Sequence, residues 1–167
     1  MNEYRITKYN PIYRNFEGNY CNDEWTSYSD IGKNYNGELF AFANYIIVEN
    51  KYIDAIVSLM NKKTNSMTIT GLEKNFDNFD ANTSEEMIIL YNELKEKCLI
   101  DIINIPTLCK LVLREYVWVR LTSPQMFIHF GYDYYMYIGI NYECKDILEK
   151  IEKSGLFVEQ LQSPYKK

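Results

Sequence analysis

The sequence predicts a single α+β domain, residues 1–167, in which an antiparallel sheet packs against about four helices. Three observations lead to this prediction. Strand-like alternation dominates the last third of the chain, helix-like spacing of apolar residues dominates the middle, and no linker, repeat or low-complexity segment separates them. With 47% hydrophobic and 25% charged residues, the chain also has the composition of an ordinary globular domain.

The first 40 residues favour extended structure and loops. Residues 3–9, "EYRITKY", alternate as a strand and end at an Asn-Pro turn signal. Residues 14–24 are polar and contain glycine, which predicts a loop. Residues 24–33, "EWTSYSDIGK", are predicted as a second strand that breaks at Gly32. Asn36-Gly37 is typical of a tight hairpin turn, although the polar run before it makes a poor strand.

The middle of the chain changes to helical periodicity at Phe42. Apolar residues then recur at spacings of three and four, which predicts a helix of about 20 residues with one buried face. Residues 66–74, "SMTITGLEK", are predicted as a short strand. A capping-box pattern at Thr83 and Glu86 predicts the start of a second helix, and Pro106 predicts the start of a third that runs to about Glu115.

The last third predicts a three-stranded meander followed by a helix and a strand. The strands are "YVWVRLT", "MFIHF" and "YYMYIGI", joined by short turns at residues 123–125 and 131–133. Alternation places Met126, Ile128 and Phe130 on one face, and His129 on the other face with Tyr135 and Tyr137. Residues 143–154 then read as a helix that stops at Gly155, and "LFVEQLQ" as the final strand.

The net charge of −5 is concentrated in one segment. Residues 73–101 carry only three lysines among eight acids, which are Glu73, Asp77, Asp80, Glu85, Glu86, Glu93, Glu96 and Asp101. The segment therefore holds a net −5, and the rest of the chain sums to zero. Such a field disfavours phosphate backbones and favours a basic partner, while a solvated helix face is the plainer interpretation.

The motifs of several enzyme classes are absent from the sequence. It contains no G-x-S-x-G elbow and no glycine-rich phosphate loop. The four cysteines are widely spaced, and a single histidine cannot complete a zinc site with them. No catalytic residue, metal or cofactor is therefore predicted. The N-terminus lacks the apolar stretch of a secretory signal, and no apolar run approaches the roughly 18 residues of a membrane span, so we expect a cytoplasmic location without membrane insertion.

An enzyme remains the main alternative from the residues alone. His129 is the only histidine, and Asp133 follows it across a turn, so the two can form a pair. Acid pairs at Asp23-Glu24, Asp77/Asp80 and Glu85-Glu86 provide further carboxylates for a metal-dependent hydrolase or nuclease. None of these pairs stands in a motif that specifies such chemistry.

Aromatic residues are unusually abundant, with sixteen tyrosines, eight phenylalanines and two tryptophans. Tyrosine combines an apolar ring with a polar tip, which suits protein interfaces, and the same rings can stack on bases in an RNA-binding regulatory module. The acidic balance and the presence of only four arginines weigh against nucleic acid. Part of the excess matches the codon usage of an AT-rich genome.

Three stretches together carry a resemblance to a known class of proteins: "EYRITKYNP…YR", "DEWTSYSDIGK" and "IHFGYDYYMYIGI…SGLFVEQ". They resemble a family of small bacterial proteins whose general character is similar to that of the immunity proteins of polymorphic-toxin and contact-dependent inhibition systems. The resemblance implies a small acidic cytosolic protein that blocks a toxin domain, often a basic nuclease, by covering its active site. It carries over no functional residue.

The leading hypothesis is therefore a non-enzymatic protein-binding module, an immunity protein that neutralises a toxin domain by direct contact. Carboxylates would steer the encounter, and exposed aromatic residues would anchor the complex. The residues predicted to bind the partner are Asp77, Asp80, Glu85, Glu86, Glu93, Tyr132, Asp133, Tyr135 and Tyr137. The sequence leaves the identity of the partner, the extent of the interface and the oligomeric state open.

Overall fold

A seven-stranded antiparallel sheet organises the computed structural model, which describes residues 1–165 apart from the side chains at positions 61 and 62. The strand order is β5-β4-β6-β7-β8-β1-β9, and neighbouring strands are antiparallel. The strands are β1 (Asn2–Thr7), β4 (Ser66–Lys74), β5 (Leu99–Asp101), β6 (Val117–Thr122), β7 (Met126–Phe130), β8 (Met136–Ile140) and β9 (Phe157–Gln160). Two-residue strands β2 (Asn34–Tyr35) and β3 (Glu38–Leu39) form a separate hairpin.

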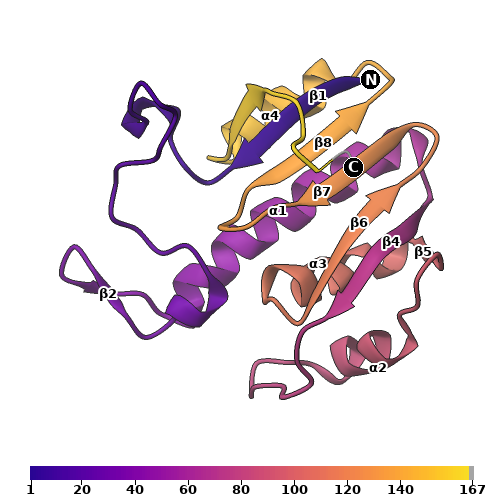
Figure 1. Ribbon diagram of the computed structural model, residues 1–167, viewed down its shortest axis with the longest axis horizontal. Coiled ribbons are helices and arrows are strands. Elements are labelled where there is room, and N and C mark those ends of the chain that lie inside the picture. The colour runs from indigo at the N-terminus through magenta and orange to yellow at the C-terminus, as the bar shows by residue number, and fades with distance from the viewer. Residues whose placement is uncertain (166–167) are drawn as a thin grey trace.

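Four α-helices complete this part of the chain, and the predicted α+β fold with an antiparallel sheet is confirmed. They are α1 (Phe42–Lys63), α2 (Glu85–Glu93), α3 (Ile105–Leu113) and α4 (Lys145–Lys153). Figure 1 shows α1, α3 and α4 behind the sheet, so that its other face is turned towards the viewer. Among the described residues, no helix is both long and apolar enough to cross a membrane.

The core lies between the sheet and these helices. The buried face of α1 is the predicted one, with Tyr45, Tyr52, Ile56 and Leu59 each fully buried. Helix α1 contains no glycine or proline over its 22 residues, and its apolar spacing keeps one stripe turned to the sheet. Burial of that stripe is the main source of its stability, because isolated helices of such length are marginal in water.

The C-terminal meander turns its residues to the predicted faces of the sheet. Strand β7 pairs with β8 so that Ile128 lies opposite Ile138 and His129 lies opposite Tyr137. Side chains alternate across the sheet, which turns the two isoleucines to the core and the other pair to the opposite face. Gly139 fits this opposite face because a Cβ at its position would lie only 2.0 Å from the ring of Phe127.

The C-terminal segment covers part of this second sheet face. Ser163 lies with its Oγ 2.7 Å from His129 Nδ1, and its backbone N–H donates to Glu3 at 3.0 Å. The ring of Tyr165 contacts those of Trp118 and Tyr137, with centroids 6.3 and 5.8 Å apart. In Figure 1 the last described residues, in yellow, accordingly pass in front of the sheet. Ser163 and Tyr165 thus cover part of the middle strands on the face of the sheet that is opposite to the helices.

Two predicted elements are wrong. Residues 24–33 form a loop with a 3-10 turn at Tyr28–Asp30, because the Asp30 carboxylate accepts the backbone N–H groups of Thr26 and Ser27 and bends the chain. The capping box predicted at Thr83 and Glu86 does not form, because α2 begins one residue later and Met87, at the third helical position, cannot return a side-chain bond. Ser84 is the N-cap of α2, and Thr83 instead directs its hydroxyl to Asp80 and to the hydroxyl of Tyr116.

Two further differences concern short strands. The Asn36-Gly37 hairpin does form, since both residues have positive φ (50° and 83°), as a tight type I′ turn requires. The three residues of β5 were not predicted at all. They pair with β4 as an edge strand, where one buried side chain, Ile100, is flanked by exposed Leu99 and Asp101.

Candidate binding site

A buried ion pair holds together one end of the molecule. Arg114, just after α3, donates to Glu49 of α1 through Nε at 2.7 Å and Nη2 at 2.8 Å. The two side chains are only 3% and 0% exposed. Arg114 also donates through Nη1 to the carbonyl oxygen of Asn82 at 2.8 Å. A bidentate pair with one further N–H donor bonded to a carbonyl helps to compensate the loss of hydration that burial imposes on both charges.

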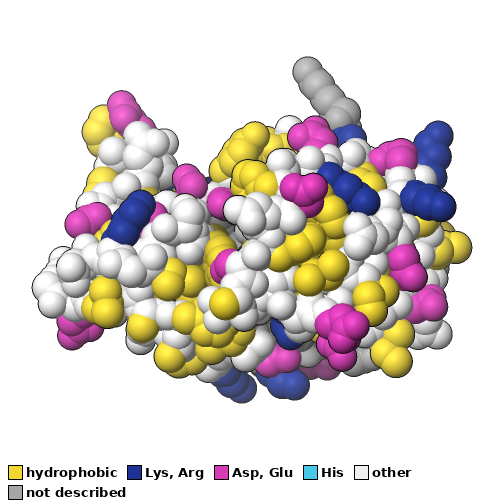
Figure 2. Space-filling view, turned by 90° about the horizontal axis from the view of Figure 1, so that it is seen from below, with side chains coloured by type: hydrophobic (Ala, Val, Ile, Leu, Met, Phe, Trp, Pro, Cys, Tyr) yellow, Lys and Arg dark blue, Asp and Glu magenta, His cyan; other side chains and the backbone are white. Residues whose placement is uncertain are grey.

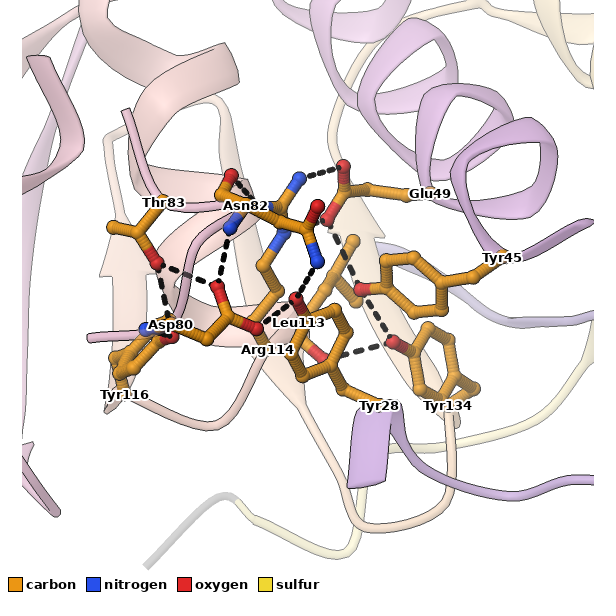
Figure 3. A network of polar contacts seen from close by, with 10 residues as sticks. All are labelled: Tyr28, Tyr45, Glu49, Asp80, Asn82, Thr83, Leu113, Arg114, Tyr116 and Tyr134. Atoms are coloured by element: carbon orange, nitrogen blue, oxygen red, sulfur yellow. Dashed lines mark hydrogen bonds and ion pairs between the residues drawn. The ribbon is translucent and has the colours of Figure 1, made fainter. Parts of the chain in front are cut away.

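Tyrosines extend this ion pair towards the β7–β8 turn, as Figure 3 shows. Tyr45 of α1 donates its hydroxyl to Glu49 at 3.0 Å. The hydroxyl of Tyr134 lies 2.7 Å from both the hydroxyl of Tyr45 and the carbonyl oxygen of Leu113. The ring of Tyr134 is therefore fixed to both α1 and the end of α3, and Arg114 and Tyr134 belong to one network.

The network also reaches the loop between β4 and α2. Tyr28 and Thr83 donate to the Asp80 carboxylate, which accepts the backbone N–H of Asn82 as well. Tyr116 joins the same cluster, since its hydroxyl lies 2.9 Å from that of Thr83 (Figure 3). These bonds hold the pKa of Asp80 below its ordinary value, although burial alone would raise it. The loop is thereby anchored on the same buried scaffold.

A cavity of about 460 Å³ opens beside this network, within the range of small-ligand and side-chain pockets. Its walls come from the turn between β7 and β8, the start of β6, the end of α3 and the segment after β4. Trp118, Phe76 and Tyr132 supply aromatic rings, and Glu115 and Asp133 supply carboxyl groups. Phe76 and Tyr132 are 53% and 82% exposed, so two large rings stand at the surface beside two acids.

Glu115 occupies a backbone position that usually belongs to glycine. Helix α3 ends in a Schellman motif, in which Tyr116 N–H bonds to Leu111 O and Glu115 N–H bonds to Val112 O, both at 2.9 Å. Glu115 is the C′ residue of this motif, with φ of 66°. A side chain in the left-handed region costs about 1–2 kcal/mol relative to ordinary backbone. This strain is the energetic cost of placing the Glu115 side chain in the wall of the cavity.

Asp133 and Tyr134 have the same unusual backbone geometry, with φ of 54° and 64°. They are the central residues of a turn in which Tyr135 N–H bonds to Tyr132 O at 3.1 Å, which is the type I′ arrangement. Asn-Gly is the usual pair in such a turn. The buried hydroxyl contacts of Tyr134 hold the strained conformation in place. Three strained residues thus line one cavity, and strain of this kind concentrates at functional sites.

The two carboxyl groups of the cavity influence one another. Partial burial raises the pKa of Glu115 above its ordinary value, and the nearby carboxylates of Asp133 and Asp30 raise it further. Glu115 is exposed over part of its surface, so this loss of hydration is incomplete. Within residues 1–165, neither Glu115 nor Asp133 has an ion pair or a side-chain hydrogen bond. The cavity therefore concentrates two acids that have no direct ion pair among the described residues; the charge of Lys8, which acts on Asp133 from a distance, is itself paired with Glu24.

The predicted partner-binding residues are divided between this cavity and other surfaces. Tyr132, Asp133 and Tyr135 line the cavity, and the hydroxyl of Tyr135 accepts a hydrogen bond from Arg14 at 2.9 Å. Tyr137 lies instead on the open sheet face under Tyr165. Asp80 does not line the cavity and directs its carboxylate into the network described above.

The remaining predicted acids lie outside the cavity. Asp77 is in the exposed loop after β4, and Glu85, Glu86 and Glu93 are exposed on α2. Figure 2, which views the side of the molecule that carries α2, shows acidic side chains spread among hydrophobic ones and not gathered in one patch. Glu96 of the same acidic segment is structural, since it accepts the backbone N–H groups of Gly71 and Leu72 at the bulge in β4.

His129 and Asp133 belong to different cavities. His129 lines a shallow depression on the open sheet face, stacked on Phe127 and in contact with Ser163. Asp133 lines the aromatic cavity at the end of the same hairpin. The Ser163 contact was not anticipated, because 34 residues separate the two positions. With His129 and Ser163 each 6% exposed, the contact fastens the chain end to the sheet.

Three of the cavity residues on which the site depends were not predicted from the sequence: Glu115, Phe76 and Trp118. Glu115 followed the predicted third helix as an ordinary terminal residue, and its positive φ leaves no sign in the sequence. Phe76 lies in a polar loop where an exposed aromatic residue is a signal that could have been used. Trp118 alternates to the less apolar face of β6, which is the only hint of its position.

No known family matches the chain, and no curated protein or solved structure is detectably similar to it. Across residues 1–165 there is no group of three or more histidine, cysteine, aspartate or glutamate side chains arranged to hold a metal ion. The functional argument therefore depends on the geometry and charge of the cavity itself.

Proposed function

We propose that this chain is a protein-binding module that neutralises a basic partner domain by direct contact, as immunity proteins of bacterial toxin systems do. One observation carries the proposal: Phe76 and Tyr132 stand exposed beside the carboxylates of Glu115 and Asp133, which have no direct ion pair among the described residues. Aromatic anchors in and around a pocket are typical of the residues that dominate protein interfaces. Uncompensated acids at the same place favour a partner of opposite charge.

Rigidity of the site supports the same function. The buried Arg114–Glu49 pair and the hydroxyl of Tyr134 fix the residues next to Glu115 and Asp133 in the chain. A surface that is already ordered loses little conformational entropy when a partner binds. Such pre-organisation is what tight inhibition of a partner domain by a small protein requires.

Co-expression with the protein encoded beside this gene tests the proposal. We expect the pair to form a complex that can be purified and to protect a host cell from the partner's toxicity. Substitution of both Phe76 and Tyr132 by alanine should abolish protection. The matched control is Phe16→Ala, because Phe16 is 98% exposed and lies outside the cavity. A wild-type chain that neither binds nor protects would contradict the proposal.

A hydrolase is the second candidate, and one observation favours it. Two carboxyl groups in an aromatic cavity, one of which has a raised pKa, are the arrangement that glycosidases use for acid–base catalysis. The measurement is hydrolysis of a panel of nitrophenyl glycosides by the wild-type chain and by Glu115→Gln. Activity that Glu115→Gln abolishes would support this candidate over the binding module.

A further inference from the structure

The aromatic cavity has the composition of a site for a positively charged group. Rings of Trp118, Phe76 and Tyr132 line it together with the carboxyl groups of Glu115 and Asp133. Among residues 1–165, none of those that line it is lysine, arginine or histidine. Faces of aromatic rings attract cations, and so do carboxylates, so that both favour a positively charged ligand. Two of the rings already have a guanidinium of the protein nearby: Arg120 lies 5.9 Å from the centre of the Trp118 ring, and Arg14 lies 5.3 Å from that of Tyr135.

Other polar groups of the cavity wall already have partners inside the protein. Trp118 Nε1–H donates to the backbone carbonyl oxygen of Phe130 at 2.8 Å. The Tyr52 hydroxyl donates to the backbone carbonyl oxygen of Tyr134 at 2.6 Å. The Tyr135 hydroxyl accepts from Arg14. The carboxylates of Glu115 and Asp133 are the acidic acceptors that remain, and a ligand that donates hydrogen bonds or carries positive charge would suit them.

We infer that this cavity binds the cationic side chain of an arginine or a lysine that projects from the partner protein. The identity of the carrier rests on the proposed function, whereas the affinity of the cavity for a cation does not. A guanidinium group fits best, because its plane can stack on a ring while its N–H groups reach the two carboxylates. Exposed Phe76 and Tyr132 would pack against the surface around that side chain.

Small cations allow a direct test on the unmodified protein. The indole N–H of Trp118 gives one NMR signal that reports on the cavity, and the indole of Trp25, which does not line it, gives an internal control. The probes are methylguanidinium and n-butylammonium, with n-butanol as the neutral analogue and butyrate as the anion. We expect saturable shifts of the Trp118 signal with both cations and none with the other two.

Substitution of both carboxyl groups tests the mechanism of binding. Glu115→Gln with Asp133→Asn keeps the shape of the side chains and should weaken cation binding by about tenfold or more, a factor equivalent to ~1.4 kcal/mol. Glu85→Gln with Glu86→Gln is the matched control, because it removes the same charge from the exposed start of α2. Equal loss in both double variants would overturn the inference, since a diffuse acidic field would then explain the binding.

Two further outcomes separate the alternatives. Lys166 and Lys167 lie outside the described residues, so the titration is repeated on a chain that ends at Tyr165. We expect it to bind the probes at least as well as the full chain. Cation binding without any complex with the partner would contradict the proposed function alone. A Trp118 signal that no cation shifts, or that n-butanol shifts equally, would overturn the cation site alone.

Discussion

Arg114 and Glu115 are neighbours in the chain, yet the protein treats their charges in opposite ways. Arg114 is buried and fully paired with Glu49, and its burial is compensated by three hydrogen bonds. Glu115 faces a cavity with Asp133 and has no cationic partner among the described residues. Asp133 and Tyr134 repeat this contrast, because the tyrosine is fixed in the network and the aspartate is not. The charges of Arg114 and Glu49 pair with one another and stabilise the fold. The neighbouring carboxylates of Glu115 and Asp133 have no direct ion pair among the described residues and are accessible to a partner.

The largest effect should follow from breaking the buried pair. Arg114→Met leaves the Glu49 carboxylate buried without a counter-charge, which should lower the free energy of unfolding by about 3–5 kcal/mol. Urea denaturation measures this loss. Adding Glu49→Leu to Arg114→Met removes the stranded charge and should restore part of the stability. A single variant as stable as the wild type would show that the pair does not support this end of the molecule.

Loss of one hydroxyl from the network should have a smaller effect. Tyr134→Phe leaves the buried carbonyl oxygen of Leu113 without this donor, and we expect a loss of about 1–3 kcal/mol in urea denaturation. Cation affinity should fall as well, because Asp133 is held in place by its neighbour. Tyr132→Phe is the control, since its hydroxyl is on an exposed side chain and its removal should leave stability within about 0.5 kcal/mol.

Substitution of Glu115, the cavity residue of this comparison, by glycine should increase stability. Glu115→Gly removes a side chain from a position with φ of 66° at the C′ position of α3, which should raise the free energy of unfolding by about 0.5–1 kcal/mol. Glu115→Gln keeps the strain and should be nearly neutral. Both variants should lose affinity for methylguanidinium. Destabilisation by glycine would mean that Glu115 contributes to the fold and not to recognition.

The pH dependence of folding should show the smallest effect, with opposite signs for two acids. The raised pKa of Glu115 makes its contribution favourable below the ordinary value of 4.5 and lost as pH rises through the folded pKa. Burial would raise the pKa of Asp30, but bonds from Lys33 and from the backbone of Thr26 and Ser27 lower it to about 2. Its contribution is present above 3.8 and lost as pH falls towards 2. The free energy of unfolding of Glu115→Gln and Asp30→Asn, measured from pH 2 to 7 against the wild type, gives the two contributions. Equal pH dependence in the two variants would contradict the opposite signs predicted for these acids.

An element of the fold could be predicted where the hydrophobic periodicity extends over many residues. Helix α1 and the β6–β8 meander were predictable because many residues share one period, so that a few exceptions do not matter. Residues 24–33 were not, because a single side chain, Asp30, turns the backbone through local hydrogen bonds. Strand β5 is only three residues long and pairs at an edge, where periodicity carries almost no information.

The candidate site was predictable only where it lies in one short stretch. Tyr132 and Asp133 stand together in a turn between two clear strands, and an exposed aromatic residue beside an acid indicates recognition. Glu115 and Phe76 reach the same cavity through the sheet order, in which β4 and β6 are neighbours although Lys74 and Val117 are 43 positions apart along the chain. The predicted acids of α2 lie on a different surface from the cavity, because charge along the sequence does not show which acids share a surface.

The central claim is that Glu115 and Asp133 form one uncompensated acidic site. An NMR titration of the Glu115 side-chain carboxyl carbon tests it most directly, in the wild-type chain and in Asp133→Asn. We predict a Glu115 pKa above the ordinary value of 4.5 in the wild type, which falls when Asp133 is neutralised and again when methylguanidinium binds. A Glu115 pKa at its ordinary value in both chains, unchanged by the cation, would contradict the account.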